Sequence, residues 1–141
     1  WYLGNVTAGN SSKDSQGTYQ EERSTSVWSG YKQTWDGKVA LIYPSDYMYA
    51  SSSCYNNGTI GFNYDDSTCT STNWLLDTNN WFWAVSPSSY GSSLVAGVNN
   101  FGNVNSGNTN VRCGLRQSVY LDSSVKYIGG DGSKEKAFEI E

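Results

Sequence analysis

The chain contains no histidine, only two prolines and three cysteines, and only 16% of its 141 residues are charged. Without histidine, the sequence cannot supply a Ser-His-Asp triad, a Cys-His pair or a zinc or iron site with histidine ligands. Nine basic residues against thirteen acidic ones give a net charge of −4, which argues against nucleic acid as a partner. No apolar run approaches the roughly 18 residues of a transmembrane helix, so we expect contact with a membrane only through a segment outside this sequence.

Uncharged polar and aromatic side chains take the place of the missing charges. The chain has 22 serines, 10 threonines and 14 asparagines, and 15% of its residues are aromatic. Disordered chains lack such large apolar groups, so the composition predicts a folded protein. The length predicts one domain over residues 1–141. A surface of hydroxyl and amide groups suits an extracellular environment.

The three cysteines suggest one disulfide. Cys54 and Cys69 flank a segment with few apolar residues, 55–68. A disulfide that closes a loop of this length would stabilise the fold by roughly 3 kcal/mol. We predict the pair Cys54–Cys69, with Cys113 left free or cross-linking, and the alternative is that the cysteines are buried thiols.

Hydrophobic patterning predicts an α+β fold that is rich in loops, with two short helices and six to eight short, mostly antiparallel strands. The first helix is expected over 19–28, after a capping box at Thr18 and Glu21 and before Gly30. The second is expected to begin at Ser45 or Asp46 and to end at Ala50. The main strands are expected at 39–43, 81–85, 94–99, 103–105, 114–121, 125–128 and 137–140.

The large apolar residues predict the core. Residues 81–85 alternate, with Trp81, Trp83 and Val85 on one face and Phe82 and Ala84 on the other. Arg116 lies inside an apolar strand and needs a buried carboxylate partner, for which we expect Asp46. The expected core residues are Trp28, Val39, Leu41, Trp74, Trp83, Leu115 and Val119.

Three aromatic residues lie outside the expected apolar face or in polar loops, namely Phe82, Tyr90 and Phe101. Exposed aromatics among Ser, Gly and Asn are typical of antibody-like binding surfaces, in which rigid rings anchor the contact and polar groups adapt to it. The predicted ligand-binding residues are Phe82, Tyr90, Ser92, Ser93, Asn99, Asn100, Phe101, Asn103, Asn105 and Arg112.

Neither a metal site nor a catalytic site is indicated. Asp65, Asp66 and Asp77, with Asn63 and Asn79, offer the oxygen ligands that calcium prefers, but they lack EF-hand spacing. Solvated loop carboxylates are the favoured interpretation, and calcium is the alternative. No pair of carboxylates has a context that marks acid–base catalysis, so we predict a protein without enzymatic activity and without a cofactor.

Several motifs in order resemble a known family. They are Gly-Lys-Val-Ala-Leu-Ile-Tyr-Pro-Ser-Asp-Tyr at 37–47, Trp-Phe-Trp-Ala-Val-Ser-Pro at 81–87, Gly-Leu-Arg at 114–116 and Gly-Gly-Asp-Gly at 129–132. The chain resembles the C-terminal domain of bacterial type IV pilin-like surface proteins, which is similar to the C-type-lectin fold in its formylglycine-generating-enzyme-like branch. That family usually has Gly-Val-Arg-Pro, whereas Gln117 replaces the proline here.

The resemblance implies an extracellular domain on a bacterial surface or pilus that binds a protein or glycan through a variable loop face. The alternative is the structural head of a pilin-like filament subunit, with other pilin subunits as partners. Either way, an N-terminal anchor or pilin helix is expected before Trp1. Enzymes of this fold use paired active-site cysteines on a longer chain, and no matching pair is present here.

The fold also occurs in the variable proteins of diversity-generating retroelements. These proteins are diversified at asparagine codons near the C-terminus. All four residues of the run Asn110-Val111-Arg112-Cys113 can be reached from such a codon, which suggests that this chain is diversified in the same way.

Overall fold

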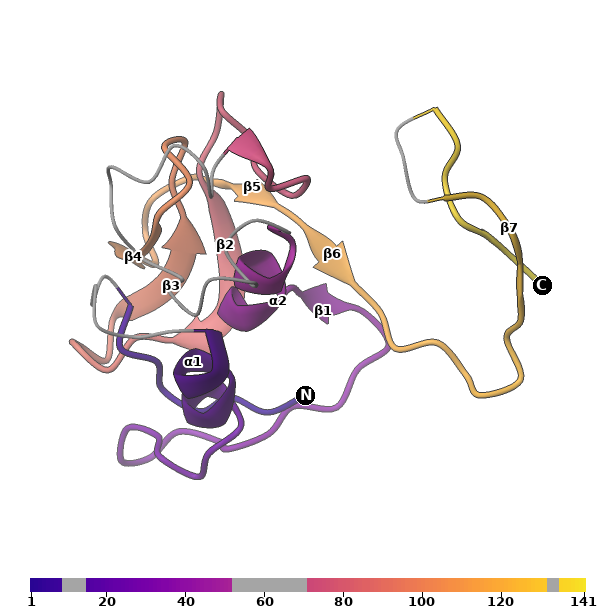
Figure 1. Ribbon diagram of the computed structural model, residues 1–141. Coiled ribbons are helices and arrows are strands. Elements are labelled where there is room, and N and C mark those ends of the chain that lie inside the picture. Colours follow the sequence, from indigo (N-terminus) through magenta and orange to yellow (C-terminus); the bar gives the residue numbers. More distant parts are fainter. Residues whose placement is uncertain (9–14, 52–70, 132–134) are drawn as a thin grey trace.

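A computed structural model of the chain describes residues 1–8, 15–51, 71–131 and 135–141. Within these residues the fold is α+β and rich in loops, as predicted, with two short helices and eight short strands (Figure 1). The helices are α1 (Ser15–Glu22) and α2 (Pro44–Tyr49). The strands are β1 (Ala40–Leu41), β2 (Phe82–Pro87), β3 (Leu94–Val98), β4 (Val104–Asn108), β5 (Gly114–Leu115), β6 (Gln117–Ser118), β7 (Tyr127–Gly129) and β8 (Glu139–Ile140).

A four-stranded sheet in the order β4-β3-β2-β5 forms the centre of the molecule. Strands β2, β3 and β4 are antiparallel neighbours, whereas β5 runs parallel to β2. A tight turn between the strands expected at 94–99 and 103–105 joins β3 to β4, and Gly102 adopts a positive φ of 89° there. The side chain of Asn99 closes this turn, because its Oδ1 accepts the backbone N–H groups of Phe101 at 3.0 Å and Asn103 at 2.9 Å.

The core lies between this sheet and α2. The ring of Tyr47 on α2 meets the ring of Phe82 edge to face at 5.9 Å, and its hydroxyl donates to the carbonyl of Gly102 at 3.0 Å. Helix α1 packs against α2 (Figure 1). The buried cluster consists of Val6, Ala8, Ile42, Tyr47, Met48, Phe82, Ala84, Ala96, Val98 and Val104.

The two faces of β2 are inverted relative to the prediction. The alternation itself is present, but Phe82 and Ala84 face the core, and Phe82 is only 2% exposed. Trp83 is half-buried on the opposite face, where its ring lies over Gly107. A Cβ at Gly107 would lie 2.7 Å from that ring, so the missing side chain makes the room that the indole occupies.

The rest of the predicted core is also mostly wrong. Trp28 and Leu41 are half-buried, whereas Val39, Trp74, Leu115 and Val119 are exposed. Strands β1 and β6 have two residues each and pair only with each other, so the side chains around them keep one open side. The inner face of the sheet fills the core instead, with Phe82 as its one large side chain beside Ala84, Ala96, Val98 and Val104.

The first helix lies earlier in the sequence than predicted. Helix α1 ends at Glu22, and Thr18 is a buried residue inside it rather than its cap. The expected capping box does not form, because the carboxylate of Glu21 accepts the backbone N–H and the hydroxyl of Thr7 at 2.9 and 3.0 Å. The second helix is closer to the prediction. It begins at Pro44, and Asp46 accepts the N–H of Tyr43 at 3.0 Å.

Other expectations concern the cysteines and the membrane. Cys54 and Cys69 lie outside the described residues, so the proposed disulfide stays a prediction. Cys113 is a half-buried free thiol, and burial raises its pKa. In the described ranges no helix combines the length and apolar character needed to cross a membrane.

Candidate functional site

The predicted loop face does not form one surface. Leu94 pairs with Asn108 and Val98 pairs with Val104, which fixes the ends of the β3–β4 hairpin. The β2–β3 connection and the β3–β4 turn therefore lie at opposite ends of these strands. Tyr90, Ser92 and Ser93 belong to the first, and residues 99–103 belong to the second, so the two groups cannot contact one small ligand together.

The individual residues of that prediction also differ in exposure. Tyr90 and Phe101 are exposed, as expected, at 58% and 66%. The exposure expected for Phe82 is wrong, since Phe82 is a core residue. Asn99 and Asn103 are buried parts of the β3–β4 turn. Of the others, Ser92, Ser93 and Arg112 are exposed, and Asn100 and Asn105 are half-buried.

A different site combines aromatic and polar groups in one hollow of about 430 Å³, which we call the aromatic pocket. Its lining comes from the N-terminus, the end of α1, the start of α2, the segment after residue 71, and β6 with the residues that follow it. The aromatic lining residues are Trp1, Tyr43, Trp74 and Tyr120, the aliphatic ones are Ile42 and Leu75, and the polar ones are Arg23, Asp46, Gln117 and Ser118.

Three of the four rings contact one another. The ring of Trp1 lies 4.5 Å from that of Tyr120, with 31° between their planes, and 6.0 Å from that of Tyr43. The indole N–H of Trp1 donates to the carbonyl of Gly37 at 3.0 Å, which fixes its orientation. Trp74 is the fourth ring, and it is 74% exposed. The pocket therefore has a fixed aromatic wall and one large ring open to solvent.

Tyr43 connects this wall to the N-terminal segment. Its hydroxyl donates to the carbonyl of Tyr2 at 3.1 Å and accepts the N–H of Tyr2 at 2.7 Å. Burial raises the pKa of Tyr43 to about 12, so the phenol stays neutral at any physiological pH. It acts as a rigid, uncharged part of the pocket.

Arg23 brings a positive charge to the pocket. Its guanidinium lies between two rings, 3.8 Å from the centre of Tyr19 and 4.2 Å from that of Tyr43. Stacking of this kind on aromatic faces holds an arginine in place while its N–H groups can still donate. The same side chain forms an ion pair with Glu22.

Glu22 is a fully buried carboxyl behind the pocket, with an exposed fraction of 0%. Its oxygens accept the N–H of Ser45 at 3.2 Å, the hydroxyl of Ser45 and the guanidinium of Arg23. Burial raises the pKa of Glu22 from 4.5 to about 7, and the hydrogen bonds from Ser45 and the charge of Arg23 oppose this rise. Glu22 thus links α1 to the first turn of α2 and positions Arg23.

Sequence reasoning missed this pocket because it assigned Trp74 to the core and gave Trp1 no site role. A usable signal was the Tyr-Pro-Ser-Asp motif, which supplies Tyr43 and Asp46 to the lining. The expected Arg116–Asp46 pair is wrong, since no such ion pair exists among the described residues. The carboxylate of Asp46 accepts the N–H of Tyr43, and the Arg116 guanidinium lies over the Phe82 ring at 5.2 Å.

Of the acidic residues considered for calcium, the structure describes Asp77 alone. In the described part of the chain no three His, Cys, Asp or Glu side chains come together as metal ligands. Asp77 accepts the N–H of Asn79 at 2.9 Å and the side-chain amide of Asn80 at 3.4 Å, and these bonds lower its pKa. Asn63, Asp65 and Asp66 lie outside the described residues.

We compared the chain with models of known protein families, with curated protein sequences and with solved structures, and none of them matches it.

Proposed function

We propose that this chain is a binding domain that recognises a carbohydrate in the aromatic pocket and catalyses no reaction. The observation that carries the proposal is the composition of one hollow, in which four aromatic rings stand beside an arginine, a carboxylate, an amide and a hydroxyl. Pockets with an apolar lining and a few convergent polar groups are the usual form of a small-ligand site.

A sugar ring matches both halves of this lining. Its C–H face packs on an aromatic ring, while its hydroxyls act as donors and acceptors at the rim. Arg23 can only donate, Asp46 can only accept, and Gln117 and Ser118 can do both. Together they offer every kind of hydrogen bond that a sugar hydroxyl makes, and the exposed ring of Trp74 offers a stacking surface.

The position of Glu22 supports binding without catalysis. A carboxyl whose pKa is close to 7 would suit a general acid, but Glu22 is fully buried and is held by Ser45 and Arg23. It cannot reach a ligand in the pocket. Among the described residues Asp46 is the one carboxylate in the lining, and glycosidases use two that flank the scissile bond.

The proposal extends to the setting of the domain. We place it on the outside of a bacterial cell or pilus, in a fold of the C-type-lectin-like type. The composition supports an exterior location, because hydroxyl and amide groups outnumber charges. The presence of two short helices before a sheet of short strands supports the fold type.

A glycan array followed by titration tests this function. The wild-type domain is expected to bind a subset of glycans, and Trp74→Ala is expected to weaken that binding at least about tenfold, which is about 1.4 kcal/mol. Because Trp74 is so exposed, its removal should leave the melting temperature unchanged. Tyr31→Ala is the matched control, since Tyr31 is also exposed and lies outside the pocket.

Two further variants test whether the glycan binds in the aromatic pocket or at the loops that the sequence predicted. If Tyr90→Ala or Phe101→Ala abolishes glycan binding and Trp74→Ala does not, the binding site lies in the loops and the pocket assignment is wrong. If the array shows no glycan bound at all, the carbohydrate proposal is wrong.

A further inference from the structure

The C-terminal part of the chain, residues 121–131 and 135–141, forms an arm that stands apart from the body (Figure 1). Strands β7 and β8 form a separate two-stranded sheet, and among the described elements they have substantial contacts only with each other. Backbone hydrogen bonds between Lys126 and Glu141 at 2.9 Å also close the arm on itself. A lone hairpin of two strands is at best marginally stable in water, so this arm needs a surface to cover it.

One face of the arm is apolar. Tyr127 and Ile140 are directly paired across the two strands, and the Tyr127 ring meets that of Phe138 edge to face at 5.9 Å. Phe138 directly precedes β8, and its ring contact with Tyr127 places it beside the directly paired side chains of Tyr127 and Ile140, so the three form one apolar cluster. Each of them is more than half exposed. Nothing in the described body covers this face.

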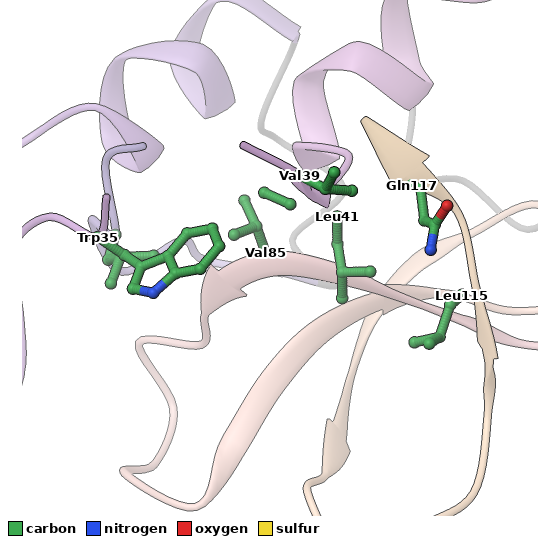
Figure 2. A pocket seen from close by; sticks show the side chains of 8 residues that line it. Trp35, Val39, Leu41, Val85, Leu115 and Gln117 are labelled. Atoms are coloured by element: carbon green, nitrogen blue, oxygen red, sulfur yellow. The ribbon is translucent and has the colours of Figure 1, made fainter. Parts of the chain in front are cut away.

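The body carries an uncovered apolar hollow of about 500 Å³, which we call the apolar groove (Figure 2). It lies beside β1 and β6, on the side where the predicted core residues Val39 and Leu115 proved to be exposed. Its lining is Leu3, Trp35, Val39, Ala40, Leu41, Val85 and Leu115, with Gln117 as its one polar residue. Contiguous apolar hollows on a protein surface usually mark an interaction site.

The two features match in chemistry and in size. A cavity of about 150 Å³ accommodates a benzene ring, so the groove has room for about three groups of that size. The arm presents two rings and one isoleucine side chain of similar bulk. Because the apolar groove and the arm occur on one chain, each molecule can offer its arm to one copy and its groove to another.

We propose that the arm of one molecule docks in the apolar groove of a second copy of this chain, with Tyr127, Phe138 and Ile140 as the inserted side chains. Such a contact joins two different surfaces. It either closes by reciprocal exchange between two molecules or continues from one molecule to the next as a filament. The proposal does not rest on carbohydrate binding, although Gln117 lines both the apolar groove and the aromatic pocket.

Two surface variants and their mixture test this inference. Phe138→Ser removes a ring from the arm, and Leu115→Asp places a charge in the groove. Both positions are about 65% exposed, so neither change should unfold the body, which circular dichroism checks. Sedimentation analysis of the wild-type chain should show a mass that rises with concentration. Each variant alone should weaken self-association at least tenfold, while Tyr31→Ser, outside both surfaces, should not.

The mixture of the two variants tests whether the arm of one molecule binds the groove of another. Phe138→Ser retains an intact groove and Leu115→Asp retains an intact arm, so an equal mixture should form a one-to-one heterodimer and nothing larger. A wild-type chain that remains monomeric at high concentration would overturn the proposal, including the case in which the arm folds back on its own groove. A mixture that fails to associate while the wild type does associate would also overturn it, because an intact arm and an intact groove would then not bind each other. So would a single variant that self-associates like the wild type, since Leu115→Asp alone would do so through arm-to-arm contact and Phe138→Ser alone through groove-to-groove contact.

Discussion

Replacing Glu22 by glutamine should change how the stability of the fold depends on pH. The pKa of Glu22 is about 7 in the folded chain and 4.5 when the side chain is in water, so the folded state binds this proton more tightly. The stabilisation from that proton is complete below pH 4.5 and is lost as the pH rises to about 7. A tenfold difference in proton affinity is worth about 1.4 kcal/mol, so the loss amounts to about 3 kcal/mol.

The assay is urea denaturation of the wild type and of Glu22→Gln at half-unit steps between pH 4 and pH 8. Glutamine cannot ionise, so the stability of the variant should lack the pH dependence that Glu22 causes. Between pH 4 and pH 8 the free energy of unfolding of the wild type should fall by about 3 kcal/mol relative to that of the variant. Glu135→Gln removes one exposed carboxyl and serves as the control for a change in net charge. If the free energy of unfolding varies with pH in the same way for the wild type and for Glu22→Gln, Glu22 does not have the raised pKa that its burial predicts.

Three further predictions concern packing and turns, each measured as a change in the free energy of unfolding. Phe82→Ala should cost about 3–5 kcal/mol because it empties the core between β2 and α2, and a cost below about 1 kcal/mol would contradict the burial of this ring. Gly97→Ala should cost about 1–3 kcal/mol, since the added Cβ would lie 2.8 Å from the backbone oxygen of Phe82. Gly91→Ala is the control and should cost less, because its Cβ would lie 3.3 Å from the flexible side chain of Leu94. Tyr47→Phe should cost about 1 kcal/mol, because the carbonyl of Gly102 loses its donor, and an unchanged midpoint would show that this hydrogen bond contributes nothing.

The elements of this fold could be predicted from the sequence where the local signal is strong. The turn between β3 and β4 lies between the two strands expected at 94–99 and 103–105, because Gly102 accepts a positive φ there. The hydrogen bonds that Asn99 accepts from the backbone of the turn were not predicted, since Asn99 was assigned to ligand binding. The start of α2 was predicted at Ser45 or Asp46 and lies at Pro44, where Asp46 accepts the N–H of Tyr43. In both cases the residues that stabilise the structure are adjacent in the sequence.

The core could not be predicted in this way, because size alone does not decide which side chains are buried. The alternation of β2 is visible in the sequence, but the choice of face depends on Gly97 and Gly107, which make room for Trp83 on the outer side. The helix α1 was misplaced because Glu21 bonds to Thr7 rather than to a helix end. These are contacts between distant segments, which no local pattern records.

The aromatic pocket was missed for the same reason. Its lining comes from five segments between Trp1 and Tyr120, and each segment contributes no more than three residues. The loop residues that drew attention, Tyr90 and Phe101, are exposed as expected, but the strand register places them at opposite ends of the hairpin. The exposure of Tyr90 and Phe101 could be predicted, whereas the grouping of residues into one surface could not.

The central claim is that a carbohydrate binds in the aromatic pocket, and the six tryptophan side chains of this chain make a direct test available. Each indole N–H gives its own signal in a nitrogen–proton correlation spectrum, which can be followed while a glycan from the array is added. Binding in the pocket predicts that the signals of Trp1 and Trp74 shift together and saturate, while that of Trp83, on the outer face of the sheet, stays in place. Saturating shifts confined to tryptophans outside the pocket, or no shift at any glycan concentration, would contradict the claim.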